Sequence, residues 1–167
     1  VNQGLSAAKR ILPIVDNEKK IIDTPSSYNL NLTEGNIEFK NINFKYSSKV
    51  TQVLNSINII IKGGKMTSVV GHSGAGKSTI LNLIPRFYDS SSGDIIIDGT
   101  SIYKIKISSL RKNISLVSQD TTLFDDTIKN NIAYANLKAN DDEILQVAKL
   151  SYADEFINQL PQKYETL

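Results

Sequence analysis

Eight residues near the middle of the chain have the types and spacing needed to hold a phosphate group. Residues 71–78 read GHSGAGKS, which matches the pattern G-x-x-x-x-G-K-S/T at every fixed position. Glycines permit the turns that aim successive backbone N–H groups at an anion. Lys77 adds a mobile positive charge for the β- and γ-phosphates, and the Ser78 hydroxyl is a ligand suited to Mg²⁺. The segment therefore predicts a loop that binds nucleotide phosphates together with magnesium.

The sequence on either side of this loop predicts the two elements that must position it. Residues 67–70 favour a short strand that leads directly into the glycines, and residues 77–87 have the pattern of an amphipathic helix. A strand, a glycine-rich loop and a helix in this order open a parallel α/β unit. The helix would present its N-terminal N–H groups and the positive end of its dipole to the anion.

The region before the loop predicts an antiparallel sheet. Apolar and polar residues alternate over residues 37–46, but the alternation changes parity midway, which indicates a bulge near residues 40–41 or two short strands. Residues 57–61 form another alternating run, and we expect one face of this sheet to contact water. Two further strands are expected, at residues 93–99 and 114–118.

Helical patterns occupy the two ends of the chain. Apolar residues have helical spacing in three late stretches, namely 127–133, 141–149 and 152–160. The acidic pair Asp141 and Asp142 suits the start of a helix, because negative charge there complements the helix dipole. Residues 3–16 favour a helix that Pro13 ends or kinks, and the polar stretch 17–35 predicts a linker.

The composition adds limits of its own. The net charge is +2 and the basic residues are scattered, which argues against a nucleic-acid-binding surface. The chain has no cysteine, so disulfides and thiolate metal sites are excluded. No apolar run approaches the ~20 residues of a membrane-spanning helix, and the first residues do not have the pattern of a signal peptide. We therefore expect this chain by itself to be soluble.

The surroundings of the loop resemble the ABC ATPases. Residues 44–99 are similar to that family along their whole length, including the stretch R-F-Y-D-x-x-x-G-x-I-x-I-D-G after the predicted helix. Residues 122–132 resemble the exporter-type continuation, and residues 4–16 resemble the connection from the last membrane helix of such exporters. The resemblance implies an α/β fold: a P-loop NTPase core with an antiparallel β-subdomain and the start of a helical subdomain.

The resemblance also implies a division of the chain and roles for its residues. The expected segments are a connection from a membrane helix (1–22), a linker (23–35), the ATP-binding core with its β-subdomain (36–125) and the start of the helical subdomain (126–167). Tyr46, 25 residues before Gly71, corresponds to an aromatic residue that stacks on adenine, and Gln119 corresponds to a glutamine that reaches Mg²⁺ and the attacking water. The implied ATP-binding residues are Tyr46, Gly71, His72, Ser73, Gly74, Ala75, Gly76, Lys77, Ser78 and Thr79. The implied magnesium ligands are Ser78 and Gln119.

Simpler structural roles compete with some of these assignments. Tyr46 could be a strand-end aromatic residue that packs on the core, and Gln119 could cap a turn. His72, the only histidine, occupies a variable position of the loop and is expected to be neutral, packed or in contact with solvent. Residues 95–97 imitate a strand that leads to a metal-binding carboxylate, but Gly99 stands where a glutamate base would be needed. We therefore interpret Asp98 as a turn residue.

Several parts needed for hydrolysis are not found in this sequence. In the ABC family they are the Walker B aspartate and glutamate, the switch histidine and the signature motif of the opposite subunit. We therefore expect the chain to be truncated before the signature and Walker B motifs. By itself it should bind Mg·ATP without turning it over, and it should expose apolar sheet edge and face.

The predicted function is the ATP-binding part of an ABC exporter, which as a full-length ATPase couples ATP binding and hydrolysis to the transport of a lipid or hydrophobic substrate. The implied partners are the transmembrane domain of the same polypeptide and a second nucleotide-binding domain in a homodimer, at the cytoplasmic face of the inner membrane, with no nucleic acid. The main alternative is a soluble ABC-type ATPase of DNA repair or translation. A small-molecule kinase would need a lid with arginines, and a GTPase would need an N-K-x-D motif; the chain has three unclustered arginines and no such motif.

Overall fold

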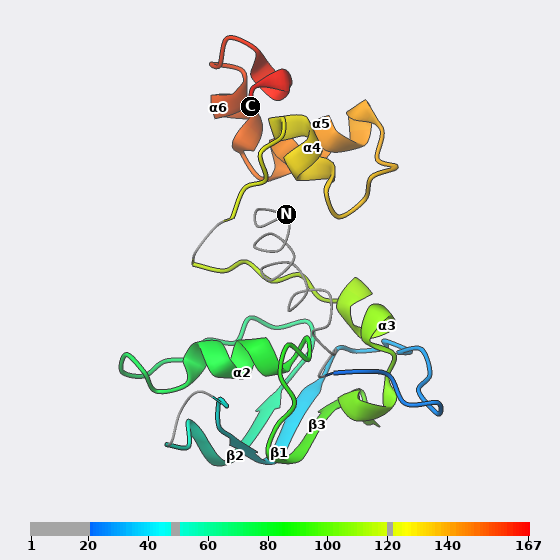
Figure 1. Ribbon diagram of the computed structural model, residues 1–167, viewed down its shortest axis with the longest axis vertical. Coiled ribbons are helices and arrows are strands. Elements are labelled where there is room, and N and C mark those ends of the chain that lie inside the picture. Colours follow the sequence, from blue (N-terminus) through cyan, green and yellow to red (C-terminus); the bar gives the residue numbers. More distant parts are fainter. Residues whose placement is uncertain (1–20, 48–50, 120–121) are drawn as a thin grey trace, which may run out of the picture. The chain divides into compact units, whose positions relative to one another are not determined.

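A computed structural model of the chain describes residues 21–47, 51–119 and 122–167 (Figure 1). The chain divides into two compact units, with the boundary between Leu116 and Val117. The helix predicted over residues 3–16 lies outside the described residues. No helix in the described part of the chain is long and apolar enough to cross a membrane.

An antiparallel sheet is the framework of the first unit. Its strands, in the spatial order β2-β1-β3-β4, are β1 (Ile37–Phe44), β2 (Leu54–Ile61), β3 (Ser92–Ile97) and β4 (Thr100–Ser101). The pairing of β1 with β2 shifts register between Phe39 and Ile42, where Asn41 has a φ of 48°. The predicted bulge is confirmed, and it lies within one continuous strand. The strand predicted over residues 93–99 is β3.

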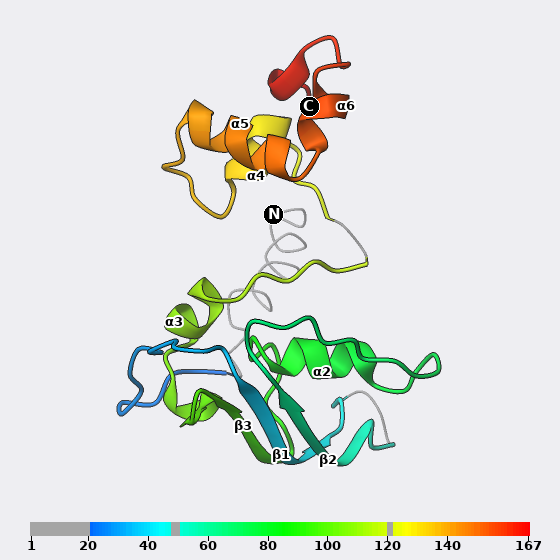
Figure 2. The ribbon, with the colours of Figure 1, turned by 180° about the vertical axis from the view of Figure 1, so that it is seen from behind.

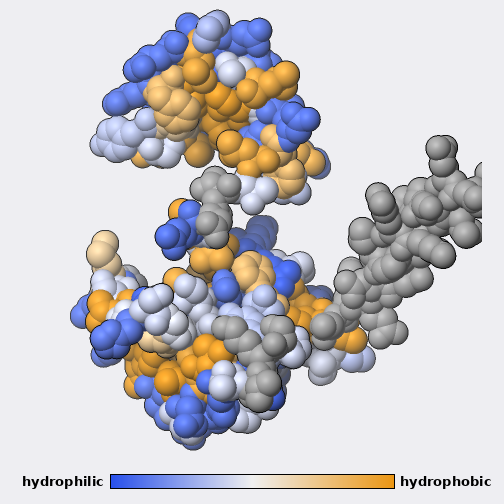
Figure 3. Space-filling model, turned by 60° about the vertical axis from the view of Figure 1, so that its left-hand side comes forward, coloured by the Kyte–Doolittle hydropathy of each residue, from blue (hydrophilic) through white to orange (hydrophobic). Residues whose placement is uncertain are grey.

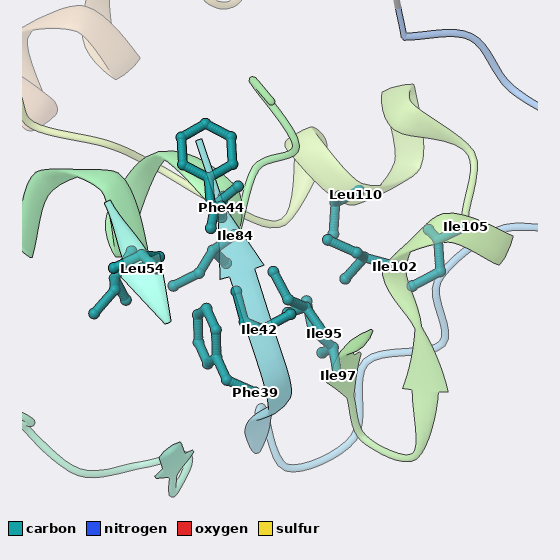
Figure 4. Close-up of a cluster of buried hydrophobic side chains, with 12 residues drawn as sticks. Phe39, Ile42, Phe44, Leu54, Ile84, Ile95, Ile97, Ile102, Ile105 and Leu110 are labelled. Carbon is teal, nitrogen blue, oxygen red and sulfur yellow. The ribbon is translucent and has the colours of Figure 1, made fainter. Parts of the chain in front are cut away.

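The sheet buries one face and leaves the other in contact with water, as the alternating pattern predicted. On β2, the side chains of Ile57 and Ile59 are half-buried, whereas that of Ile60, on the opposite face, is 69% exposed. Figure 4 shows the buried side chains of β1 and β3 converging with those of neighbouring elements. The core consists of Phe39, Ile42, Phe44, Leu54, Ile80, Leu83, Ile84, Ile95, Ile97, Ile102, Ile105 and Leu110.

One helix covers the buried face of the sheet. Helix α2 (Lys77–Leu83) contributes Ile80 and Leu83 to the core (Figures 1 and 2). It is shorter than the predicted helix over residues 77–87. Pro85 cannot donate a backbone hydrogen bond, and Arg86 adopts a left-handed φ of 57°, so the helical ladder cannot continue.

Two predicted strands are not present. Residues 67–70 and 114–118 have no regular secondary structure, and neither segment pairs with a strand among the described residues. Their side chains are largely exposed, with Val70 at 87% and Val117 at 94%. The prediction of strands here was wrong, because a β-ladder needs a neighbouring strand as well as a favourable sequence.

Two short helices that the sequence pattern did not indicate complete the first unit. They are the 3₁₀ helix η1 (Ile102–Lys104) and the helix α3 (Ile107–Lys112), with Leu110 fully buried. The stretch before β1, which we predicted to be a linker, is bound against them. The backbone of Tyr28 bridges to Ile105, and the Leu30 N–H donates to Ser109 Oγ at 3.0 Å.

The second unit is helical. It contains α4 (Ile128–Ala133), α5 (Asp141–Leu150), α6 (Ala153–Ile157) and the 3₁₀ helix η2 (Lys163–Glu165). Thr127 caps α4, while Asn140 and Glu143 form a reciprocal capping box on α5. Helix α6 is shorter than the predicted 152–160: it begins only after Tyr152, which takes a left-handed φ of 59°, and it ends at Ile157. The helices at the other two predicted stretches are confirmed.

Candidate functional site: the phosphate loop

The loop of residues 71–78, here called the phosphate loop, joins the irregular segment 67–70 to the start of α2. Residues 71–75 are exposed, so the loop is open to a ligand. Gly74 and Gly76 have φ values of 80° and 88°, in the left-handed region that favours glycine. A Cβ on Gly74 would meet no atom within 4 Å, so only its backbone conformation requires glycine there.

Gly76 anchors the phosphate loop to the sheet. It is buried and forms the N-cap of α2. A Cβ at this position would lie 2.7 Å from Leu54 Cδ2, closer than carbon atoms can pack, and 3.4 Å from Val53 Cγ1. Both the left-handed φ and the close approach therefore require glycine. The second fixed glycine of the motif thus fits the loop against the start of β2.

Lys77 folds back over the loop that it follows. Its Nζ donates hydrogen bonds to the Gly71 carbonyl oxygen at 2.9 Å and to the His72 carbonyl oxygen at 2.7 Å. The Ala75 N–H closes the turn by donating to the His72 oxygen at 3.2 Å. The ammonium group is therefore held beside the exposed loop, where a phosphate oxygen could take the place of a carbonyl oxygen.

The start of α2 adds two further features that suit an anion. The first four N–H groups of an α-helix have no partner within the helix, and the dipole places partial positive charge at this end. Of the two hydroxyl residues here, Ser78 is exposed, whereas Thr79 is 5% exposed and shares a hydrogen bond with the Tyr46 hydroxyl, Oγ1 to Oη, at 3.0 Å. Ser78 is accordingly the hydroxyl available to a metal ion.

Tyr46 lies beside the first turn of α2. It is half-buried, and its ring contacts Phe44 and Tyr88 edge to face, with centroids 4.7 and 5.0 Å apart. The hydrogen bond to Thr79 brings its hydroxyl to the residue directly after Ser78. Both the packing role and the adenine role considered above are compatible with this position, and stacking on adenine stays a prediction.

Two other predicted site residues, His72 in the loop and Gln119 outside it, have exposed side chains. His72 is exposed and uses its backbone oxygen to accept from Lys77. Gln119 is exposed and lies in the second unit, so its contact with Mg²⁺ stays a prediction. Within residues 21–47, 51–119 and 122–167, no group of three or more histidine, cysteine, aspartate or glutamate residues could hold a metal ion.

The donors present at the loop fit Mg·ATP. Magnesium in nucleotide sites keeps several waters and phosphate oxygens as ligands, and needs only one or two from the protein. The Ser78 hydroxyl can supply one of these, while the loop N–H groups and Lys77 are donors suited to phosphate oxygens. When bound, magnesium would neutralise phosphate charge; the protein groups would bind and orient the phosphates.

Asp98 lies outside this site and has a structural role, as we interpreted from its place before Gly99. It sits in the turn after β3 with a φ of 46°. Its carboxylate accepts four backbone N–H groups at 2.8–3.1 Å, those of Thr33, Glu34, Gly35 and Asn36. These bonds, led by those from Gly35 and Thr33, hold the Asp98 pKa well below its ordinary value. The sequence did not indicate them, since the partners are more than sixty positions away.

Together, the antiparallel sheet, the glycine-rich loop and the helix that follows define a nucleotide-binding protein of the P-loop NTPase class. Comparisons with known proteins agree. The profile of the ABC transporter family matches residues 54–166. The chain belongs to the ABC transporter family.

Relatives extend the match over almost the whole chain. The chain is 41% identical over 167 residues to an ATP-dependent lipid A-core flippase of Syntrophus aciditrophicus, covering 100% of this chain and 28% of the relative. It is 44% identical over 165 residues to the flippase of the same name from Haemophilus influenzae, covering 98% of this chain and 28% of the relative. It is also 43% identical to the chloroplastic ABC transporter B family member 29 of Arabidopsis thaliana, over 99% of this chain and 26% of the relative.

A solved structure shows the same fold. A bacterial Atm1-family ABC exporter with ATP bound superposes with a TM-score of 0.86 at 36% identity, over 99% of this chain and 29% of that chain. The chain thus spans less than a third of the length of each of these proteins.

Proposed function

We propose that this chain is the ATP-binding part of an exporter that uses ATP to move a lipid or another hydrophobic substrate across a membrane. The observation that carries the proposal is the phosphate loop, in which an exposed glycine-rich turn, the start of α2 and the Lys77 ammonium meet. Its contribution is to bind and orient Mg·ATP through the loop, Ser78 and Tyr46. The names of the relatives, flippase and exporter, support the transport part.

Hydrolysis needs groups in addition to those described here. A water must be oriented, and negative charge that develops on the phosphates must be matched by positive charge and metal. We infer that Gln119 supports the metal and the water, and that the Walker B and signature motifs come from the remainder of the protein and from a second nucleotide-binding domain. The full-length protein would then act as an ATPase, most simply as a homodimer.

The second unit offers a surface for the membrane part of the transporter. An apolar hollow of about 570 Å³ lies between α4, α6 and the flanking segments, with Leu123, Phe124, Ile132, Phe156 and Leu160 in its lining. Figure 3 shows hydrophobic residues gathered on a face of this unit. Leu123 is 75% exposed and Phe156 is 55% exposed, so this surface suits contact with a partner. We infer that the partner is the transmembrane domain of the same polypeptide, at the cytoplasmic face of the inner membrane.

The first experiment is calorimetric titration of nucleotides into the full-length protein in the presence of Mg²⁺. ATP should bind saturably and AMP at least about tenfold more weakly, because AMP lacks the phosphates that the loop and Lys77 would hold. Equal affinity for ATP and AMP, or no binding of ATP to the folded protein, would contradict the proposal.

Transport is tested separately in vesicles. The full-length protein reconstituted into liposomes should move a labelled lipid between leaflets when Mg·ATP is supplied, and should not do so with AMP. A full-length protein that fractionates as soluble and needs no lipid would instead favour the alternative, a soluble ABC-type ATPase. The match of the chain to exporters over 98–100% of its length favours the membrane protein.

A further inference from the structure

Three aromatic rings meet beside the first turn of α2. Tyr46 contacts Phe44 and Tyr88 with interplanar angles of 86° and 88°, which is edge-to-face geometry. Phe44 and Tyr88 also contact each other, with centroids 5.8 Å apart. Edge-to-face contacts of this kind are favourable because the positive ring edge meets the negative ring face. Each ring therefore restrains the other two, and we call them the three-ring cluster.

Tyr46 is fixed at two points within this arrangement. Its ring lies between the other two aromatic residues, and its hydroxyl is bonded to Thr79 Oγ1 at 3.0 Å. A side chain that rotates freely loses that freedom when a ligand immobilises it, and the loss lowers affinity. A tyrosine already held in place avoids most of that cost. The contacts around Tyr46 therefore matter for any ligand that stacks on it.

The residues around Tyr46 differ in how much they contribute to the hydrophobic core. Phe44 is 2% exposed and belongs to the core of the sheet, and Thr79 is buried in α2. Tyr88, in contrast, is 43% exposed and lies in an irregular segment after α2. Its ring is thus less needed for the core than that of Phe44, and it packs against the rings of Phe44 and Tyr46.

We propose that Tyr88 is a positioning residue for nucleotide binding, which holds the Tyr46 ring ready for the adenine base while Thr79 holds its hydroxyl. The proposal rests on the proposed binding of ATP and deepens it by adding a residue that does not itself touch the phosphates. It connects the base-binding side chain to the first turn of the phosphate-binding helix through one hydrogen bond.

The test compares a ligand that has a base with one that lacks it. Mg·ATP and magnesium tripolyphosphate are titrated calorimetrically into the full-length protein and its Tyr88→Ala variant. Loss of an edge-to-face aromatic contact should weaken ATP binding by roughly twofold to tenfold. Binding of tripolyphosphate, which cannot stack, should not change. The ratio of the two affinities isolates the base, so a general loosening of the protein would not produce the expected result.

Two further variants serve as controls. Phe87→Ala removes a ring of similar exposure, 44%, from the adjacent position, but that ring lies against the Arg111 guanidinium at 5.1 Å. It should leave the affinity ratio unchanged. Tyr88→Phe keeps the aromatic edge and should bind ATP as the parent does. If Tyr88→Ala fails to fold, Tyr88→Leu, which keeps much of the volume without an aromatic edge, carries the same expectation.

The outcomes separate this inference from the function on which it rests. The role of Tyr88 would be overturned if Tyr88→Ala left the ratio of the two affinities unchanged, which includes an equal loss of affinity for ATP and tripolyphosphate. It would also be overturned if Phe87→Ala changed the ratio as much as Tyr88→Ala does. A parent protein that binds tripolyphosphate as tightly as ATP would overturn the base contact as a whole. A parent that binds neither ligand would instead contradict the proposed function.

Discussion

Two segments of this chain hold a charged side chain through backbone groups, and they differ in the sign of that charge. At residues 33–36, four N–H groups donate to the Asp98 carboxylate, which belongs to the same chain. In the phosphate loop, the group held beside the turn is a cation, the Lys77 ammonium. The first arrangement is complete by itself, whereas the second is electrostatically suited to an anion from outside.

The comparison teaches how one backbone device serves either structure or binding. When the carboxylate is covalently attached, the bonds join the segment before β1 to the turn after β3. At residues 71–75 the loop is exposed, and the charged group beside it is a lysine, so an anionic ligand can reach it from solvent. We therefore expect changes at Asp98 to affect stability and changes in the phosphate loop to affect ligand affinity.

The largest expected effect is on the binding side. Lys77→Ala in the full-length protein should weaken Mg·ATP binding by more than about 100-fold, because bonds to charged groups are each worth about 1.5–3 kcal/mol. The melting temperature without ligand should change little, since both Lys77 bonds are exposed. Calorimetry and thermal unfolding measure the two quantities. Lys65→Ala, which removes the same charge from an exposed residue before the loop, should bind normally.

A change at Gly76 should affect both stability and ligand affinity, because this residue belongs to the phosphate loop and also packs against the sheet. Gly76→Ala places a Cβ 2.7 Å from Leu54 Cδ2 and in a left-handed conformation, so it should cost about 1–3 kcal/mol of stability and also weaken ATP binding. Gly74→Ala is the matched control, because it has the same kind of φ but open space around the added Cβ. In denaturant unfolding, Gly76→Ala should have a lower free energy of unfolding than Gly74→Ala. The reverse order would contradict the packing role.

A smaller effect is expected when the internal carboxylate is changed. Asp98→Asn keeps the shape of the side chain but removes its charge and one acceptor oxygen, so some of the four N–H groups lose their partner. The melting temperature should fall, while the affinity for Mg·ATP measured well below that temperature should stay the same. An Asp98→Asn variant with normal stability and weak ATP binding would show that Asp98 does not act mainly on stability.

The smallest effect is a pH dependence of stability. Because the folded-state pKa of Asp98 is lowered, chiefly by the N–H groups of Gly35 and Thr33, its contribution is fully present above the unfolded-state value of about 3.9. It decreases as pH falls from there toward the lower folded pKa. The difference in melting temperature between the parent and Asp98→Asn should therefore be constant from pH 7 to about 5 and shrink below about 4. Part of the difference should remain at pH 3, because the folded-state pKa lies well below that value; a difference that does not decrease between pH 4 and pH 2 would count against the charge as its cause.

Local patterns predicted much of the fold. The alternating strands with the bulge near residues 40–41, the helices over residues 127–133 and 141–149 and the glycine-rich loop each follow from a residue pattern within the segment itself. The conformation of the loop follows from its own glycines, so its shape could be expected without knowledge of the rest. The roles of the loop residues, Tyr46 and Gln119 in binding ATP and magnesium remain predictions.

What the sequence did not predict depends on distant partners. Residues 67–70 and 114–118 have strand-like composition, but a strand forms only where another strand accepts its hydrogen bonds. Helix α3 was not indicated, because Ser108 and Ser109 are weak helix formers; buried Leu110 and the bonds of Arg111 to the carbonyl oxygens of Pro85 and Arg86 help hold it in place. The Asp98 bonds and the three-ring cluster are likewise made by residues far apart in the chain.

Because Leu54 packs closely against Gly76, residue 54 can influence the phosphate loop from the core side. The Leu54 side chain fills the space that a Cβ of residue 76 would occupy, so a side chain of another shape at position 54 changes the packing behind the loop. We expect Leu54→Met or Leu54→Ile to change the affinity for nucleotide, although residue 54 is not among the predicted ligand-binding residues. Variation in the apolar core of this domain is then a second way, besides changes in the loop itself, by which the affinity of the phosphate loop is set.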